Sequence, residues 1–164
     1  MQAEARLKRT DPVEARPVAE LLACPPETGG LLTAAAQCID FEAGQTIFRQ
    51  SSLCAGLYLV VAGQLVRRTE RLETRIVLGS ARPGDLVELA AALGDRRHTF
   101  SLVAQTRGSL LLLPIESLQH AFQTYPPLRM NLLEELAREV SRAYHSSSLS
   151  NRLRTRRKSS QSPT

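Results

Sequence analysis

The chain has 164 residues, of which 43% are hydrophobic, so it is long enough for one globular domain with a substantial core and too short for two full domains. Five basic residues and no acidic residue follow Asn151, so the other 16 basic residues equal the 16 acidic ones and the body is neutral. The net charge of +5 therefore belongs to a tail, which argues against a nucleic-acid-binding body. There is no apolar run of about 18 residues and no secretory signal, so we expect a cytoplasmic protein without membrane association.

The N-terminal part is predicted to hold a disordered arm followed by two short helices. Residues 1–16 are charged and free of aromatic residues, and Pro17 ends them. The stretches "VAELLAC" and "LLTAAAQC" favour helix. We expect "PPETGG" between them to break the helical pattern, because proline lacks an amide hydrogen and glycine loosens the backbone. The folded domain is placed at residues 17–145.

Residues 39–113 show the pattern of short strands. Apolar, partly β-branched segments alternate with turn residues at regular spacing. This pattern predicts a mainly β fold with flanking helices, built as an antiparallel sandwich or barrel. The predicted strands are "CIDF", "QTIF", "GLYLVVAGQLVRR" with an interruption at Gly63, "TRIVLGS", "HTFSLVAQT" and "GSLLLLP".

One segment of this region departs from the strand pattern. "DLVELAAAL" is rich in alanine and predicts a short helix. The first amides of a helix lack intrahelical acceptors and lie at the positive end of its dipole. We therefore expect this segment to present amides to an anion enclosed by the strands.

The C-terminal third is predicted to be helical. "IESLQHAFQTY" ends at Pro126 and Pro127, and "LRMNLLEELAREVSRAYHSSSL" resumes the helix. An apolar stripe with spacings of three and four suits packing on a core or on a partner helix, and it consists of Leu132, Leu133, Leu136, Val140 and Ala143. The basic, serine-rich residues 146–164 are expected to form a disordered tail.

The cysteines and the known catalytic motifs give little sign of chemistry. Cys24, Cys38 and Cys54 form no CxxC pair and have no histidine at ligand spacing, so they predict reduced thiols with no disulfide and no metal. There is no GxSxG, Walker loop, HExxH or paired carboxylates near a histidine, which indicates that the chain is not an enzyme.

Taken together, the segments resemble the cyclic nucleotide-binding domain family over about residues 35–145. The matching features are Phe41 and Gly44, "LYLVVAGQLV", the "PGD" turn with Gly84 and Asp85, Glu88, "VAQT", and the final strand with its two helices. The resemblance implies an eight-stranded, jelly-roll-like antiparallel β-roll with a long C-terminal helix. It also implies a pocket for a cyclic phosphate, which makes a cyclic nucleotide the candidate ligand.

The resemblance implies a site at Val87, Glu88, Leu89, Arg97, His98 and Thr99. In the family, the glutamate accepts from the ribose hydroxyl, an arginine at the position of His98 pairs with the ring phosphate, and the next residue adds a hydroxyl. Glu88 and Thr99 match this pattern. His98 replaces the arginine, Val87 replaces a small residue, and Ser51 replaces a common glycine. Strand alternation argues against a one-residue shift that would bring Arg97 into the pocket.

These departures weigh against tight binding of cyclic AMP in the usual mode, because losing such an ion pair commonly costs about 2–5 kcal/mol. One hypothesis is a sensor that binds a nucleotide or small anion atypically and signals through the C-terminal helix. The other is a ligand-free module that forms a homodimer through that helix or docks on a protein partner. A further alternative is the sensor part of a transcription regulator. The resemblance carries no helix-turn-helix module within these residues, so no sequence-specific DNA binding is expected of them.

Overall fold

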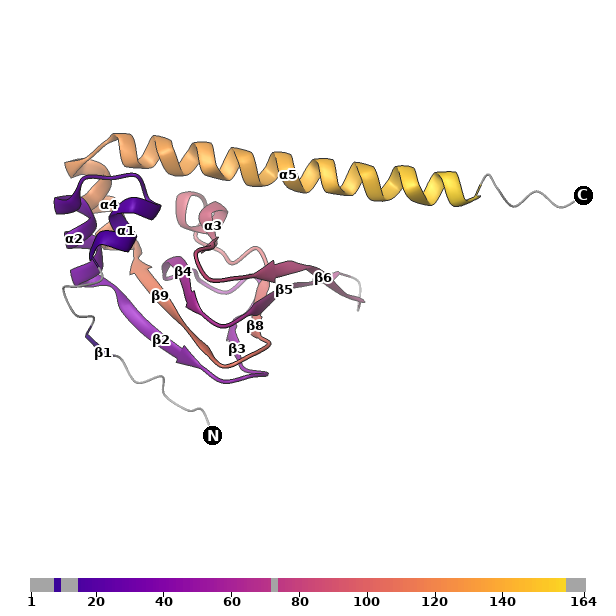
Figure 1. Cartoon of the computed structure of the whole chain (residues 1–164), viewed down its shortest axis with the longest axis horizontal. Coiled ribbons are helices and arrows are strands. Elements are labelled where there is room, and N and C mark those ends of the chain that lie inside the picture. Colours follow the sequence, from indigo (N-terminus) through magenta and orange to yellow (C-terminus); the bar gives the residue numbers. More distant parts are fainter. Residues whose placement is uncertain (1–7, 10–14, 72–73, 159–164) are drawn as a thin grey trace, which may run out of the picture.

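The computed structural model of the protein describes the backbone of residues 8–9, 15–71 and 74–158, and the side-chain environment of residues 18–70 and 77–144. Two antiparallel sheets form a roll, and a long C-terminal helix runs across it and extends beyond it (Figure 1). The strands are β1 (Lys8–Arg9), β2 (Gln37–Phe41), β3 (Thr46–Phe48), β4 (Gly56–Ala62), β5 (Leu65–Arg71), β6 (Thr74–Ala81), β7 (Leu86–Val87), β8 (Ser101–Ala104) and β9 (Gly108–Pro114). The helices are α1 (Ala15–Leu21), α2 (Pro26–Ala35), α3 (Leu89–Leu93), α4 (Ile115–Thr124) and α5 (Pro127–Lys158).

The strand order confirms the predicted antiparallel β-roll. One sheet has the order β1-β2-β9-β4-β7 and the other has the order β3-β8-β5-β6, and every pairing within them is antiparallel. Gly63 lies in the turn between β4 and β5 with φ of +85°, and a Cβ there would lie 2.6 Å from the carbonyl oxygen of Arg107. Glycine is therefore required where the chain passes from one sheet to the other.

Strands β4 and β9 are buried on both faces, which explains their nearly continuous apolar sequences. Successive side chains of a strand point to opposite faces. Leu57 and Leu59 belong to a core beneath the helices, whereas Tyr58 and Val60 belong to a second core inside the roll. Strand β9 alternates in the same way between the two cores. The sheet they share thus separates a helix-facing core from the roll interior.

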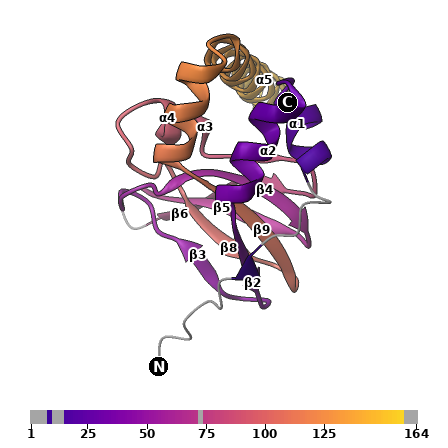
Figure 2. The same cartoon turned by 90° about the vertical axis from the view of Figure 1, so that its left-hand side faces the viewer.

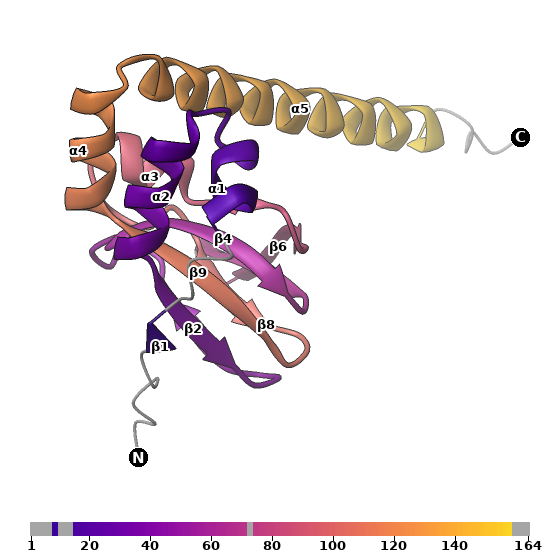
Figure 3. The same ribbon diagram turned by 60° about the vertical axis from the view of Figure 1, so that its left-hand side comes forward.

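The helices cover the end of the roll and one outer face of the first sheet (Figures 2 and 3). Leu118 of α4 and Leu128 and Leu132 of α5 are buried in the helix-facing core together with Leu32 of α2. Leu132 and Leu136 of the predicted apolar stripe pack on the body, whereas Leu133 and Val140 are 38% and 61% exposed. None of the described helices combines the length and the apolarity that crossing a membrane needs.

The expected break between the two helices exists but lies earlier than "PPETGG", because α1 ends at Leu21 and α2 begins at Pro26. Pro26 occupies the first turn of α2, where a proline costs nothing because its missing amide would have had no intrahelical acceptor. Gly29 is buried in the same helix, at a point where a Cβ would lie 2.5 Å from the Cβ of Ala19. The segment therefore starts a helix and lets α1 and α2 approach closely.

The expected helix over "DLVELAAAL" is only partly correct. Leu86 and Val87 form β7, which pairs with Leu59 and Tyr58 of β4, and α3 covers only Leu89–Leu93. Glu88 lies between them with φ of +74°, in the left-handed region. Pairing with the otherwise unpaired edge of β4 overrides the helical preference of Leu86 and Val87. Likewise, residues 98–100 of the expected strand "HTFSLVAQT" form a loop, and β8 begins at Ser101.

The two expected disordered termini are partly ordered. Lys8 and Arg9 pair with Cys38 and Gln37 as β1, while residues 1–7 and 10–14 lie outside the described residues. The predicted tail is wrong as far as Lys158, because α5 continues to that residue, and residues 159–164 lie outside the described part. Leucine, arginine and lysine are good helix formers, which accounts for the helical backbone of these residues.

Candidate functional site

The carboxyl group of Glu88 is bound by three donors from the loop that precedes β8. Thr99 Oγ1 lies 2.7 Å from Glu88 Oε1, and the amide of Thr99 donates to Oε2 at 3.2 Å. His98 Nδ1 lies 2.9 Å from the same Oε2. Because both oxygens already accept from Thr99, the arrangement fits an ionised carboxylate with a proton on His98 Nδ1. Glu88 is 4% exposed and His98 is 3% exposed, so the carboxylate and the imidazole are buried, whereas Thr99 is at the surface.

The ring of His98 is fixed by aromatic neighbours and by its loop. Phe48 stacks on it with ring centroids 3.7 Å apart and an interplanar angle of 7°. The amide of His98 donates to Ser52 at 2.9 Å, and the amide of Ser51 donates back to His98 at 2.8 Å. Ser51 has φ of +69°, which agrees with a position where the sequence resemblance places glycine. His98 is therefore held against Glu88 by both its ring and its backbone.

The other residues predicted for the site do not gather around one ligand position. Val87 is 1% exposed and packs in the core of the roll, and Leu89 is 1% exposed and packs in the helix-facing core. Arg97 is exposed, and its guanidinium donates to the carbonyl oxygen of Ser51 at 3.3 Å. The structure thus brings Glu88, His98 and Thr99 together and leaves Arg97 on the outside.

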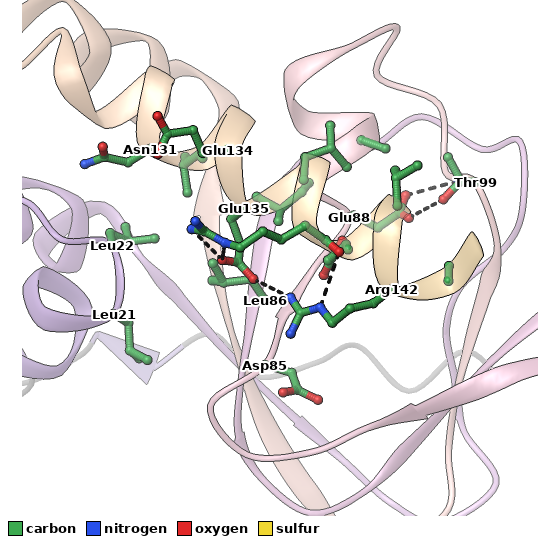
Figure 4. Close-up of a pocket in the computed structure, with 18 of the residues that line it drawn as sticks. Leu21, Leu22, Asp85, Leu86, Glu88, Thr99, Asn131, Glu134, Glu135 and Arg142 are labelled. Atoms are coloured by element: carbon green, nitrogen blue, oxygen red, sulfur yellow. Dashed lines mark hydrogen bonds and ion pairs between the residues drawn. The ribbon is translucent and has the colours of Figure 1, made fainter. Parts of the chain in front are cut away.

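A cleft of about 1130 Å³ separates the roll from α5 beside this cluster. Glu88 and Thr99 lie on its roll side, while Glu135 and Arg142 project from α5 (Figure 4). Arg67 of β5 also lines the cleft, with its guanidinium carbon 5.6 Å from the centroid of the Phe100 ring. Its Nε is buried and makes no hydrogen bond within the described part of the chain. A buried guanidinium nitrogen without a hydrogen-bond partner is uncommon in protein structures.

The helix side of the cleft carries its own ion pairs and one perturbed carboxyl group. Glu135 accepts from Arg142 at 2.9 Å and from Arg138 at 3.0 Å, so both arginines are engaged. Burial raises the pKa of Glu139 above its ordinary value, and the positive charge of Arg67 opposes that increase. Glu139 on α5 and Arg67 on β5 thus line the same cleft, and they are close enough for their charges to interact.

Arg67 and Phe48 were missed as site residues by the sequence analysis. Arg67 lies in "GQLVRR", where two adjacent arginines give no indication of which one faces inward. Phe48 ends a short apolar strand and looks like an ordinary core residue. Recognising either residue as part of the site requires knowledge of the strand pairing. β3 and β5 are far from β8 in the chain and lie on either side of it only in the folded sheet.

The β-roll, the short helix after Glu88 and the long C-terminal helix define a domain of the β-roll class. The family model of the cyclic nucleotide-binding domain matches residues 38–125, more than half of the chain. The chain therefore belongs to the cyclic nucleotide-binding domain family. A comparison with curated proteins gave no match.

Solved structures with the same fold include a catabolite activator protein and two regulators. The catabolite activator protein of Thermus thermophilus is 26% identical with a TM-score of 0.70, over 82% of this chain and 63% of that chain. The sensor domain of the regulator DNR from Pseudomonas aeruginosa is 17% identical, with a TM-score of 0.67 over 81% of this chain and 89% of that one. The c-di-GMP-responsive regulator CLP of Xanthomonas campestris is 20% identical, with a TM-score of 0.64 over 76% and 63%. The chain thus spans less than two thirds of the length of the Thermus protein.

Proposed function

We propose that the chain is a non-enzymatic regulatory sensor domain that binds a nucleotide or another small anion in the cleft between the roll and α5. The observation that carries the proposal is the buried Nε of Arg67, which lines the cleft without a hydrogen-bond partner in the described part of the chain. A phosphate oxygen would supply that partner, and arginine binds phosphate with two parallel hydrogen bonds. Family membership supports a cyclic nucleotide as the first ligand to test.

The mode of binding is atypical, because the carboxylate of Glu88 is already engaged by His98 and Thr99. A ribose hydroxyl would have to compete with three internal donors for its two oxygens. Val87 also fills the roll core where a small residue would allow close approach of the ligand. In this mode Arg67 pairs with the phosphate in place of the family's arginine at position 98. The affinity is then weaker than that of a site in which both an arginine at position 98 and a free glutamate at position 88 bind the ligand.

Among anionic ligands, the charges of the cleft disfavour a ligand with several negative charges more than a ligand with one. Acidic side chains outnumber basic ones along its walls, and two of the three arginines are paired with Glu135. A ligand with several charges would be repelled by the remaining carboxylates, whereas a cyclic mononucleotide carries one charge. The basic lining residues are Arg67, Arg138 and Arg142, and the acidic ones are Asp85, Glu88, Glu134, Glu135 and Glu139.

Isothermal titration and thermal-shift titration with cyclic AMP, cyclic GMP and c-di-GMP test this proposal. We expect a saturable shift with a mononucleotide, since ligand at about 100 times its Kd stabilises the fold by about 2.7 kcal/mol. Arg67→Gln is expected to weaken binding by about 30-fold or more, because truncating one side of a buried charge pair costs about 2–5 kcal/mol. Arg68→Gln is the matched control, since Arg68 is the next residue of β5 and is not among the cleft residues.

The absence of a shift with all three nucleotides at millimolar concentration would contradict the nucleotide-sensor function. Equal weakening by Arg67→Gln and Arg68→Gln would contradict the role of Arg67 and would leave the sensor function standing. The two results are therefore distinguishable.

Signalling is proposed to pass through α5, which forms one wall of the cleft. Leu133 and Val140 are 38% and 61% exposed on this helix and continue the apolar stripe away from the body. A second copy of the chain, packed helix against helix, would cover them. Sedimentation velocity should give a dimer, Val140→Asp should give a monomer, and Ser141→Asp at the neighbouring exposed position should leave the dimer intact. A wild-type monomer at all concentrations would contradict the homodimer.

A ligand-free module that acts by dimerisation or docking is the second candidate function. The internal pairing of Glu88 with His98 favours it, because the usual acceptor for the ligand is used within the protein. It predicts a dimer or a stable complex through α5 together with no response to any nucleotide.

A further inference from the structure

We infer that Cys54, Glu88 and His98 form a binding site for one divalent metal ion of the zinc class. The Cys54 thiol sulfur, a Glu88 carboxylate oxygen and an imidazole nitrogen of His98 all lie within 4.8 Å of one another. The three residues are 2%, 4% and 3% exposed, respectively. The inference goes beyond the proposed sensor function, because it requires neither the cleft ligand nor α5.

Backbone pairing between two loops holds the three side chains together. The amide of Cys54 donates to the carbonyl of Arg96 at 2.8 Å, and the amide of His98 donates to Ser52 at 2.9 Å. These bonds fix residues 51–54 against residues 96–98. Glu88 reaches the same place from the turn between β7 and α3, where its left-handed backbone directs the side chain into the roll. Three separate segments thus converge on one buried point without any strand or helix contributing two of the ligands.

The three atoms are close enough to occupy three corners of a tetrahedral zinc site after small side-chain movements, with a water molecule at the fourth corner. Zinc binds thiolate sulfur at about 2.3 Å and nitrogen or carboxylate oxygen at about 2.0–2.2 Å, so neighbouring ligand atoms lie about 3.3–3.6 Å apart. His98 Nδ1 and Glu88 Oε2 are 2.9 Å apart and would separate by a few tenths of an ångström. The largest distance between two of the three ligand atoms is at most 4.8 Å. It would shorten by about 1 Å on metal binding, and small rotations of the side chains are enough for that.

The charges and protons of the site balance for a divalent ion. The Cys54 thiol now donates to the carbonyl of Gly56 at 3.0 Å. On binding, this thiol would release its proton to solvent and the proton on His98 Nδ1 would move to Nε2, so that both atoms could coordinate. One thiolate and one carboxylate then neutralise the two positive charges of the ion, which a buried site requires.

Thr99 and Phe48 hold the proposed ligands Glu88 and His98 in position from outside the cluster. Thr99 donates to both oxygens of Glu88 and orients the carboxylate, and Phe48 stacks on the ring of His98. Sulfur, imidazole and carboxylate together favour zinc or a similar transition metal, because calcium and magnesium prefer all-oxygen sites. An ion at this point would cross-link the two loops to the segment that carries Glu88.

Cobalt titration of the purified full chain, stripped of metal and kept reduced, tests the inference directly. We expect one equivalent of Co²⁺ to bind with a near-ultraviolet thiolate-to-cobalt charge-transfer band and with the intense visible bands of cobalt held by the three side chains and one water molecule. One equivalent of Zn²⁺ should remove these bands. Absence of the charge-transfer band at one equivalent and at tenfold excess would overturn the inference.

The cysteines provide matched control variants. Cys54→Ser should abolish the charge-transfer band and weaken binding by more than the roughly 10–100-fold that loss of an outer-shell group costs. Cys24→Ser and Cys38→Ser should leave the band unchanged, since neither sulfur belongs to the cluster. A band that persists in Cys54→Ser, or that disappears in either control, would overturn the assignment.

A measurement on the wild-type chain covers the case in which Cys54→Ser fails to fold. Zinc X-ray absorption of the loaded protein should give one sulfur at about 2.3 Å with nitrogen and oxygen ligands at about 2.0–2.2 Å. A shell of only nitrogen and oxygen would indicate metal bound elsewhere and would overturn the site.

Discussion

His98 Nδ1 lies 2.9 Å from Glu88 Oε2, and both side chains are almost completely buried. The family resemblance places an arginine for a ligand phosphate at position 98 and an acceptor for a ribose hydroxyl at position 88. In this chain the two residues bind each other. The contact ties the segment that carries Glu88 to the loop that precedes β8.

Removing the imidazole should strongly destabilise the fold. His98→Leu leaves the buried carboxylate of Glu88 without one of its three donors, and breaking a buried pair by removing one partner costs about 3–5 kcal/mol. Urea unfolding measures the change. His120→Leu, at an exposed position of α4, should stay within about 0.5 kcal/mol of wild type.

The double variant separates pair energy from packing. If the contact is a coupled pair, His98→Leu together with Glu88→Leu should cost less than the sum of the two single changes, because neither side chain is then left unpaired. Strict additivity of the three unfolding free energies would show that the two residues act independently.

The hydroxyl of Thr99 should contribute measurably to stability. Thr99→Val keeps the shape of the side chain and removes the donor that lies 2.7 Å from Glu88 Oε1. A hydrogen bond to a charged acceptor is worth about 1.5–3 kcal/mol, and partial exposure places the expected loss near the lower end. Thermal and urea unfolding measure it, with Thr46→Val, at the exposed first residue of β3, as the control. Equal effects of the two changes would contradict a specific role for the hydroxyl.

Two adjacent glycines of α2 should respond in opposite directions to the same substitution. Gly30→Ala meets no atom within 4 Å and should stabilise the helix by about 0.5–1 kcal/mol. Gly29→Ala gains the same helix propensity, but its Cβ would lie 2.5 Å from the Cβ of Ala19 and 2.9 Å from its Cα. We expect Gly29→Ala to lower the unfolding free energy. Stabilisation by both variants would show that α1 and α2 are not in this close contact.

The raised pKa of Glu139 predicts a defined pH dependence. Burial raises this pKa most, Arg67 and Arg142 oppose the increase, and Glu135 and Asp85 add to it. Because the folded pKa exceeds the ordinary value of 4.5, the folded state binds more protons than the unfolded state above that pH. The unfolding free energy of wild type therefore falls as the pH rises from about 4.5 through the folded pKa.

Glu139→Gln lacks this titration. Its unfolding free energy relative to wild type should increase between about pH 4 and pH 7, as measured by urea unfolding at several pH values. Glu134→Gln, at an exposed position of the same helix, is the control. A difference between Glu139→Gln and wild type that does not change with pH would contradict the raised pKa.

The sequence by itself determined the class of fold. Short apolar segments with turn residues predict the roll, and the double burial of β4 and β9 accounts for the runs "LYLVV" and "LLLL". Two further features are determined locally, because backbone conformation and proline geometry depend on few residues. They are the turn at Gly63 between the sheets and the start of the long helix near Pro127. The positions of Glu88 and Thr99 followed from the spacing of the family pattern.

Only the tertiary structure decided what these residues contact. Leu86 and Val87 form a strand because β4 offers them an unpaired edge, which outweighs a helical preference worth less than about 1 kcal/mol per residue. The pairing of His98 with Glu88, the position of Cys54 beside them and the inward side chain of Arg67 depend on loops and strands that are far apart in the chain. Burial and electrostatic interaction depend on distances in space, and spacing along a sequence does not encode distances between segments that meet only after folding.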